Sequence, residues 1–115
     1  MHAGAAGPFR DYTLYMMALY PQVYADIGVL TWQGGEELLG GFLRKAKQWG
    51  VLDRVMFGTD QMFWPEAIGM AVERVNGYDF LTIEEKAGIF YDNAARFMGL
   101  SKEEVTRHHK RTANK

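Results

Sequence analysis

The small number of strand-forming segments limits the fold of this chain most. Residues 22–27 (QVYADI) are β-prone and lie between Pro21 and Gly28, which predicts one strand, and residues 54–58 (RVMFG) predict a second. A helical segment over residues 36–49 separates them, and one strand–helix–strand period of about thirty residues is usual for a βαβ unit. Strands that alternate with helices predict a parallel sheet with right-handed crossovers.

The remaining segments are predicted to be helical or irregular. Residues 9–20 form a mostly apolar helix, expected to be buried on several sides, and residues 28–35 form a loop. The apolar stripe of the helix over residues 36–49 consists of Leu39, Phe42, Leu43, Ala46 and Trp49. A further helix opens at Pro65, and its stripe consists of Ile68, Ala71, Val72 and Val75.

Two capping boxes mark further helix starts. Thr82 followed by Glu85 begins a helix that reaches about residue 91 or continues to residue 97, with Gly99 at its end. Ser101 followed by Glu104 begins a short charged helix, beyond which we expect a solvated, unstructured terminus.

The predicted sheet is too small for a self-contained α/β domain. Parallel sheets are normally covered on both faces and hold more than three strands. Only two strands are complete here, and a third is represented at most by its carboxyl tip at residues 1–3. The sequence therefore predicts either an unusual fold or a part of a larger one.

Composition narrows the class of protein. The chain has 115 residues, 48% of them hydrophobic and 14% aromatic, which favours a packed core over disorder. The absence of cysteine excludes disulfides, thiolate zinc sites and cysteine nucleophiles. No apolar run reaches the ~18 residues of a membrane span, and no signal peptide is recognisable at the N-terminus, so we expect a cytoplasmic protein without a membrane partner.

The distribution of charge argues against nucleic-acid binding. The net charge is −1, but residues 101–115 hold five Lys or Arg and two Glu, so the body of the chain is net negative. A negative body repels phosphates, and the basic tail lacks the interleaved aromatic residues of a single-strand binder. We therefore expect no nucleic-acid partner.

Asp60 is the strongest candidate for a catalytic or metal-binding residue. It follows the second strand in the turn Phe57-Gly58-Thr59-Asp60, and active sites of parallel α/β proteins lie at the carboxyl ends of the strands. A carboxylate there serves as a metal ligand or a general base. The alternative role is structural, in which Asp60 caps the next helix or bonds to loop amides.

Two further side chains are candidates for the same edge of the sheet. His2 lies there if residues 1–3 end a strand, and an imidazole binds a metal or moves protons, whereas the plainer interpretation is an exposed residue beside Met1. Asp26 ends the first predicted strand and either lines this edge or bonds to nearby loop amides, and we favour the second role.

Other polar and aromatic residues are weaker candidates for functional residues. His108 and His109 are adjacent in the basic tail and more typical of a solvated face than of a metal patch. Met16 and Met17 are interpreted as core residues. Trp32 and Trp64 lie in predicted loops that could border a pocket.

Two motifs resemble one known family. Residues 54–60 (RVMFGTD) resemble the eighth strand of the amidohydrolase-related, metal-dependent TIM-barrel hydrolases, where a Gly-Ser/Thr-Asp turn delivers the metal-binding aspartate. Residues 81–100 (LTIEEKAGIFYDNAARFMGL) resemble the closing helix of that family, with its LTxEEKxxI stretch running into NAxRxxGL. Residues 20–28 and 1–4 are similar to its seventh strand and to the HxG end of its sixth.

The resemblance implies a partial TIM (β/α)8 barrel. Residues 1–100 would be the C-terminal part of the barrel with its last two to three parallel strands, and residues 101–115 a charged C-terminal helix or tail. In the whole enzyme a divalent metal, often zinc, would activate water for attack on an amide, ester or lactone of a small-molecule substrate, or the reaction would be a related decarboxylation.

The resemblance also implies roles for individual residues. Asp60 would bind the metal or accept a proton from the metal-bound water, and His2 would act at the active site as an acid/base, a polarising group or a ligand. Asn93 and Arg96 would tie the closing helix to the barrel. The family's histidines from the first and fifth strands have no counterpart here, so we expect the isolated chain to be inactive.

The alternative function is a small non-catalytic α/β module. An unpaired parallel edge carrying Val, Tyr, Met and Phe would favour self-association or a protein partner. A homo-oligomer formed without metal is the expectation that separates this alternative from the enzyme.

Overall fold

A two-stranded parallel sheet lies at the centre of the computed structural model, which describes residues 2–3 and 7–113. Strand β1 (Ala25–Asp26) pairs with β2 (Val55–Met56), with Ala25 opposite Val55. Both strands are shorter than predicted because the flanking backbone is engaged elsewhere: Val23 closes a turn with Tyr20, and β2 follows the 3-10 turn η2 (Leu52–Arg54). Helices combined with a small parallel sheet fit an α/β fold.

The predicted strand tip at the N-terminus is not found in the described residues. His2 and Ala3 form no strand, and Met1 lies outside the described part of the chain. Ala3 has a φ of 35°, a left-handed conformation that interrupts extended backbone. Its side chain is nevertheless fully buried in the core, so this segment is packed against the rest of the molecule.

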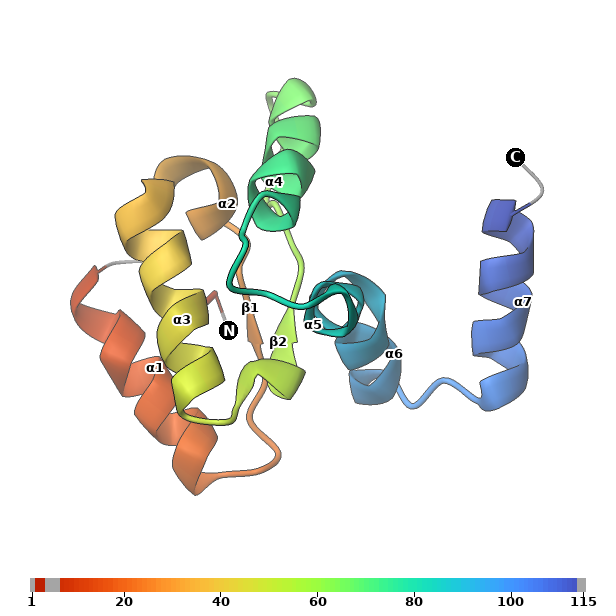
Figure 1. Cartoon of the computed structure of the whole chain (residues 1–115), viewed down its shortest axis with the longest axis horizontal. Helices are drawn as coiled ribbons and strands as arrows, with labels where there is room; N and C mark the ends of the chain where they lie inside the picture. The colour runs from red at the N-terminus through yellow and green to blue at the C-terminus, as the bar shows by residue number, and fades with distance from the viewer. Residues whose placement is uncertain (1, 4–6, 114–115) are drawn as a thin grey trace.

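Two helices lie side by side beside the sheet (Figure 1). They are α1 (Gly7–Leu19) and α3 (Gly41–Gln48), and α3 is preceded by the π-helical turn η1 (Glu36–Gly40). Lys45 on α3 contacts Asp11 on α1 at 2.8 Å. Part of the predicted loop over residues 28–35 is instead the short helix α2 (Leu30–Gln33).

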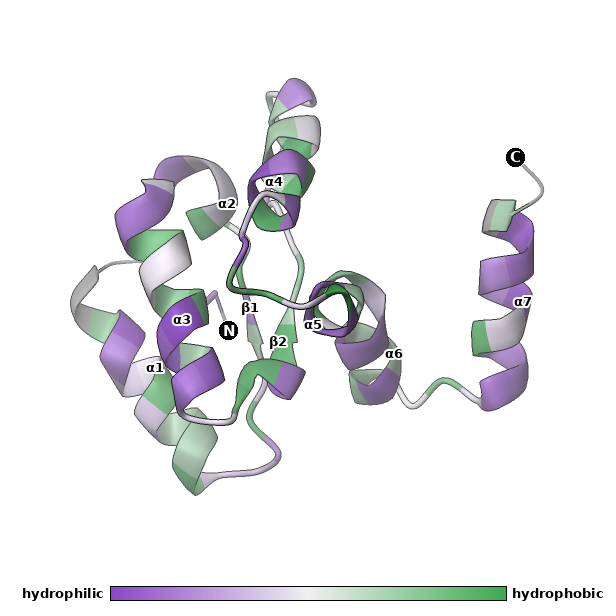
Figure 2. Ribbon diagram, in the orientation of Figure 1, coloured by the Kyte–Doolittle hydropathy of each residue, from purple (hydrophilic) through white to green (hydrophobic). Residues whose placement is uncertain are grey.

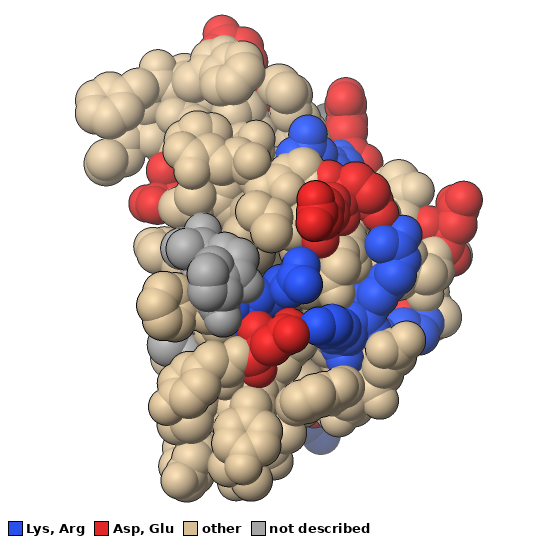
Figure 3. Space-filling model, turned by 90° about the vertical axis from the view of Figure 1, so that its left-hand side faces the viewer, with Lys and Arg blue, Asp and Glu red and all other residues tan. Residues whose placement is uncertain are grey.

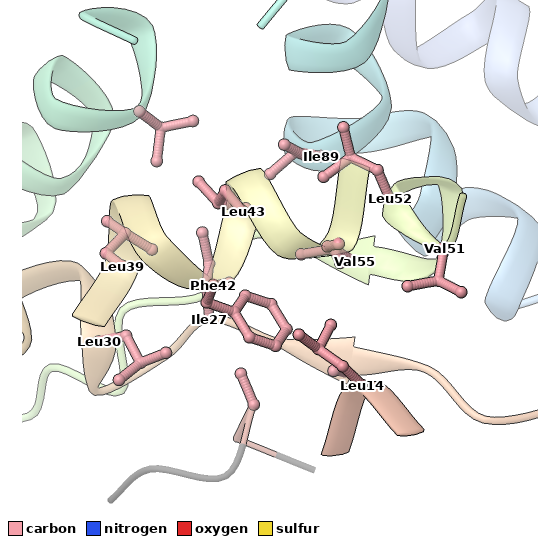
Figure 4. Packing of buried hydrophobic residues seen from close by; sticks show 14 of the residues in the cluster. Leu14, Ile27, Leu30, Leu39, Phe42, Leu43, Val51, Leu52, Val55 and Ile89 are labelled. Atoms are coloured by element: carbon pink, nitrogen blue, oxygen red, sulfur yellow. The ribbon is translucent and has the colours of Figure 1, made fainter. Parts of the chain in front are cut away.

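The core lies between α1, α3 and the two strands (Figure 4). Phe42 and Leu43 from α3 are fully buried, together with Leu14 from α1 and Val55 from β2. The predicted burial of Trp49 is wrong, because this residue caps the C-terminal end of α3 beyond the core and is 47% exposed.

Helix α4 (Glu66–Asn76) packs against α2 through small residues. Its buried face consists of Ala67, Ala71 and Val75, whereas Ile68, which was predicted to be buried, is 46% exposed. The stripe thus begins one residue earlier than predicted. Small side chains allow the two helices to approach closely.

Helix α1 is not buried on several sides, contrary to the prediction. Its buried residues are Thr13, Leu14 and Met17, which confirms the core role of Met17, while Met16 is half-buried. Its exposed large apolar residues are Phe9, Tyr12, Tyr15 and Leu19. Within the described chain α1 packs chiefly on α3, and this leaves most of its surface in solvent.

Residues 83–97 form one continuous helical run beside β2. It consists of α5 (Ile83–Ala87), the π-helical turn η3 (Gly88–Asp92) and α6 (Asn93–Phe97). Both hydrogen bonds of the predicted Thr82–Glu85 capping box are present, which confirms that start. Gly99 ends the run with a φ of 69°, as predicted.

This helical run covers the outer edge of β2. The Met56 carbonyl accepts a hydrogen bond from the Ile27 amide, so the backbone groups of Val55 and Phe57 face away from β1. There the Phe57 amide donates to the Ile89 carbonyl at 2.8 Å, and the Asn93 Nδ2 donates to the Val55 carbonyl at 2.7 Å. The predicted open sheet edge is therefore wrong for the Phe57 amide and the Val55 carbonyl, which already have partners.

Asn93 and Arg96 tie the helical run to the body, as predicted. The buried Asn93 Nδ2 also donates to the Leu52 carbonyl at 3.1 Å, and Arg96 Nη1 donates to the Asp53 carbonyl at 3.1 Å. Both side chains thereby hold the turn that leads into β2.

The C-terminal segment is more ordered than predicted. Helix α7 (Lys102–Ala113) begins with the predicted Ser101–Glu104 capping box and is hydrophilic over most of its length (Figure 2). His108 and His109 are not a purely solvated pair: His108 Nδ1 lies 2.7 Å from the Tyr91 hydroxyl, and His109 packs against the same ring. No helix in the described part of the chain is long and apolar enough to cross a membrane.

Candidate functional site

Three of the polar residues singled out in the sequence meet at one end of the sheet. Asp26 is the last residue of β1, and Asp60 lies four positions after Met56, the last residue of β2. His2 contacts both: its Nδ1 lies 2.7 Å from Asp26 Oδ1, and its Nε2 lies 3.7 Å from Asp60 Oδ2. The carboxyl ends of the parallel strands therefore carry one imidazole between two carboxylates.

Asp26 combines both roles that the sequence analysis weighed. Its Oδ1 accepts a hydrogen bond from the Gly28 amide at 3.0 Å, which is the loop contact that we favoured, and it also contacts His2. Burial raises the pKa of Asp26, but hydrogen bonds from His2 and Gly28 outweigh it, so the pKa lies below its ordinary value. Asp26 is thus ionised near neutral pH and can only accept hydrogen bonds.

Asp60 occupies a left-handed backbone conformation, with a φ of 52°. Aspartate tolerates this conformation better than most residues do. Gln61 takes the structural role proposed as the alternative for Asp60, because its Oε1 accepts hydrogen bonds from the amides of Phe63 and Trp64 at 2.9 and 2.7 Å. The Asp60 carboxylate remains 43% exposed beside His2.

A buried threonine and a tryptophan hold the loops beneath this site. The fully buried Thr31 hydroxyl donates to the Gly28 carbonyl at 2.8 Å and approaches the Gly58 carbonyl at 3.4 Å. Trp32 Nε1 donates to the Thr59 carbonyl at 2.7 Å. Trp32 thus supports the loop that carries Asp60, whereas Trp64, the other tryptophan near the site, is 48% exposed.

Gly28 was missed as a site residue. A Cβ atom at this position would lie 2.8 Å from Asp26 Oδ1 and 2.9 Å from His2 Nδ1, closer than side-chain carbons approach such atoms. The spacing Asp26-Ile27-Gly28 was the available signal, since an aspartate often accepts a hydrogen bond from the amide two residues later. Thr31 left no such local signal, because its contact with Gly58 spans 27 residues.

The site matches zinc in the type of its donors but not in their number. Imidazole nitrogen and carboxylate oxygen are both usual zinc ligands, and His2 Nε2 and Asp60 Oδ2 lie on the same side of the sheet edge. Catalytic zinc usually has three protein ligands. The described residues contain no group of three or more side chains placed to hold a metal ion, so they supply at most part of a metal site.

Comparison with known proteins supports one family. No curated protein and no solved structure matches the chain. A family model described as amidohydrolase matches residues 1–100, which include both strands, the helical run that ends at Phe97, and the three side chains at the sheet edge. By this match over most of its length, the chain belongs to the amidohydrolase family of hydrolase-like enzymes.

Proposed function

We propose that this chain is the C-terminal part of a metal-dependent (β/α)8-barrel hydrolase and supplies one side of its active site. The observation that carries this proposal is the meeting of His2 and Asp60 at the carboxyl ends of two parallel strands. Family membership supports a hydrolase-like enzyme. The proposed reaction is hydrolysis of an amide, ester or lactone in a small molecule, or a related non-oxidative decarboxylation.

The two side chains have distinct parts in this proposal. Asp60 binds a divalent metal, zinc for this donor set, or accepts the proton that the metal-bound water releases. His2 serves through its Nε2, as a further ligand or as the group that takes up and returns a proton. A divalent metal in such a site lowers the pKa of bound water toward neutrality, which provides hydroxide for the attack.

The incomplete donor set leads to a prediction for the chain by itself. We expect it to bind zinc more weakly than micromolar, because two ligands replace the usual three, and to show no turnover of amide, ester or lactone substrates. Isothermal titration of the metal-free chain with zinc measures the affinity. Asp60→Ala and His2→Ala should abolish the residual binding.

The matched control is Asp79→Ala, which removes an exposed carboxylate on the turn after α4. It should leave the zinc affinity unchanged. Zinc binding that survives Asp60→Ala would remove Asp60 from the metal site, and tight binding with measurable turnover would show that the chain is a complete enzyme.

The exposed aromatic face of α1 favours a second candidate, a non-catalytic module that binds another protein surface. Phe9, Tyr12 and Tyr15 are each more than half exposed on this helix. Figure 3 shows uncharged side chains over much of the face that α1 and α3 form. An exposed apolar patch of this kind is typical of a contact surface.

Sedimentation velocity of the metal-free chain separates the two candidates. A barrel part whose contact faces lack their neighbours should give a broad, concentration-dependent distribution of species, which is the result we expect. A discrete dimer in the presence of a chelator would instead favour the module that self-associates. Tyr12→Lys on the α1 face would then dissociate that dimer, and Ile83→Lys, at another exposed apolar position, would not.

A further inference from the structure

We propose that Asp26 is a positioning residue that holds the neutral His2 ring with its proton on Nδ1, so that the unprotonated Nε2 faces Asp60. The use of that nitrogen in catalysis rests on the proposed function above, whereas the position of the proton does not. From the sequence we favoured a contact of Asp26 with nearby loop amides, and the structure adds its contact with His2.

The side chains of His2 and Asp26 are in direct contact. His2 Nδ1 lies 2.7 Å from Asp26 Oδ1, a distance typical of a strong, charge-assisted hydrogen bond. An ionised carboxylate has no proton to donate, so the ring nitrogen has to be the donor. In a neutral imidazole the proton on one nitrogen leaves the other as an acceptor, and the bond to Asp26 therefore decides the state of Nε2.

The backbone fixes the Asp26 oxygen that accepts the hydrogen bond from His2. The same Oδ1 accepts from the Gly28 amide at 3.0 Å, and Asp26 belongs to the strand that pairs with β2. Gly28 has no side chain, and any Cβ there would meet both Asp26 Oδ1 and His2 Nδ1 at less than 3.0 Å. The ring and the carboxylate thus fit over a glycine that leaves space for both.

Asp60 faces the other nitrogen of the His2 ring. His2 Nε2 and Asp60 Oδ2 are 3.7 Å apart, which is beyond hydrogen-bond distance, so Asp60 does not compete for the ring proton. With Nδ1 protonated, the neutral ring presents a lone pair toward the space beside Asp60. That lone pair accepts a proton or binds a metal, and it cannot donate a hydrogen bond to a substrate carbonyl.

Nitrogen-15 NMR of the metal-free chain with labelled histidine tests the inference. The chain has three histidines, so His2→Gln identifies the His2 signals against those of His108 and His109. The spectra are recorded at about pH 8.5, above the reference pKa of a free imidazole, and the protonated and unprotonated nitrogens of a neutral ring have different shifts. We expect a protonated Nδ1 and an unprotonated Nε2 for His2.

Variants at Asp26 test whether its side chain determines which nitrogen of the His2 ring carries the proton. Asp26→Ala should remove the preference for the Nδ1 proton, whereas Asp26→Asn should retain it, because the amide oxygen can still accept from both Gly28 and His2. Asp79→Ala is the matched control and should leave the His2 shifts unchanged. Amide spectra show whether each variant is folded, and if Asp26→Ala does not fold, the wild-type and Asp26→Asn spectra decide.

Two results would overturn the inference: a His2 ring in the wild-type chain that carries its proton on Nε2 or divides it evenly, or an unchanged ratio in a folded Asp26→Ala variant. Because the spectra are recorded without metal, they are independent of the zinc titration. Zinc binding that survives Asp60→Ala, together with the expected His2 proton, would overturn the proposed function alone. Zinc binding that is lost in Asp60→Ala, together with the other His2 tautomer, would overturn this inference alone.

Discussion

Asn93→Ala is expected to lower the free energy of unfolding by about 3 kcal/mol, since a buried polar group left without a partner costs about 1–3 kcal/mol and a cavity adds to this. Asn93 is 2% exposed, and its Nδ2 donates to the carbonyls of Val55 and Leu52. The Leu52 carbonyl keeps the Val55 amide as a partner, so the Val55 carbonyl suffers the larger loss. Urea unfolding followed by tryptophan fluorescence measures the change.

Two comparisons make this result specific. Asn93→Asp keeps the shape of the side chain but turns a donor into a carboxylate oxygen that faces two carbonyls, so it should destabilise the protein at least as much as alanine does. Asn76→Ala, at the exposed end of α4, should change the free energy of unfolding by less than about 0.5 kcal/mol. A similarly small change for Asn93→Ala would show that this amide does not hold the helical run on β2.

Gly28→Ala is expected to separate His2 from Asp26 and to destabilise the fold by about 1–3 kcal/mol, the usual cost of inserting a methyl group where no space exists. The added carbon would lie 2.8 Å from Asp26 Oδ1 and 3.2 Å from His2 Cε1. Because Asp26 is held by its strand, His2 is the group that has to move. Urea unfolding measures the cost, and the His2 ring nitrogen shifts report the separation.

Gly58→Ala is the matched control for this substitution. Gly58 lies at the same end of the sheet, but a Cβ there would approach Asp26 Oδ1 only to 3.5 Å, an ordinary contact. We therefore expect a change within about 0.5 kcal/mol and unaltered His2 shifts. Equal effects of the two substitutions would mean that the space around Gly28 has no special relation to the His2–Asp26 pair.

Local patterns predicted the order of the elements well. The segments predicted as strands contain β1 and β2, both capping boxes begin helices, and Gly99 has the left-handed backbone expected at a helix end. Each of these features depends on residues within a few positions of one another, so the sequence displays its cause directly.

The errors arose where distant residues decide the outcome. The apolar spacing of the helix over residues 36–49 predicted that Trp49 is buried. Only the structure shows that the core ends before the C-terminal end of this helix, where Trp49 is exposed. The same holds for the π-helical turn over residues 88–92, whose Ile89 carbonyl accepts a hydrogen bond from the amide of Phe57, the residue after β2. Periodicity describes one element, whereas these features are set by pairs of elements.

In the candidate site too, the local features could be predicted from the sequence, whereas the contacts between distant residues could not. The position of Asp60 after a strand was visible in the sequence, and so was the possibility that His2 shares its edge of the sheet. The bond between His2 and Asp26 joins residues 24 positions apart and depends on a glycine that leaves them space. Neither the bond nor the space leaves a periodic signal, and the structure was needed to find both.

The helical run beside β2 has a consequence for any strand that would join the sheet there. Ile89 and Asn93 already occupy the outward amide of Phe57 and the outward carbonyl of Val55. A neighbouring strand could be added there only by exchanging these two bonds for its own. While these bonds hold, the Phe57 amide and the Val55 carbonyl are not available for pairing with an edge strand of another chain.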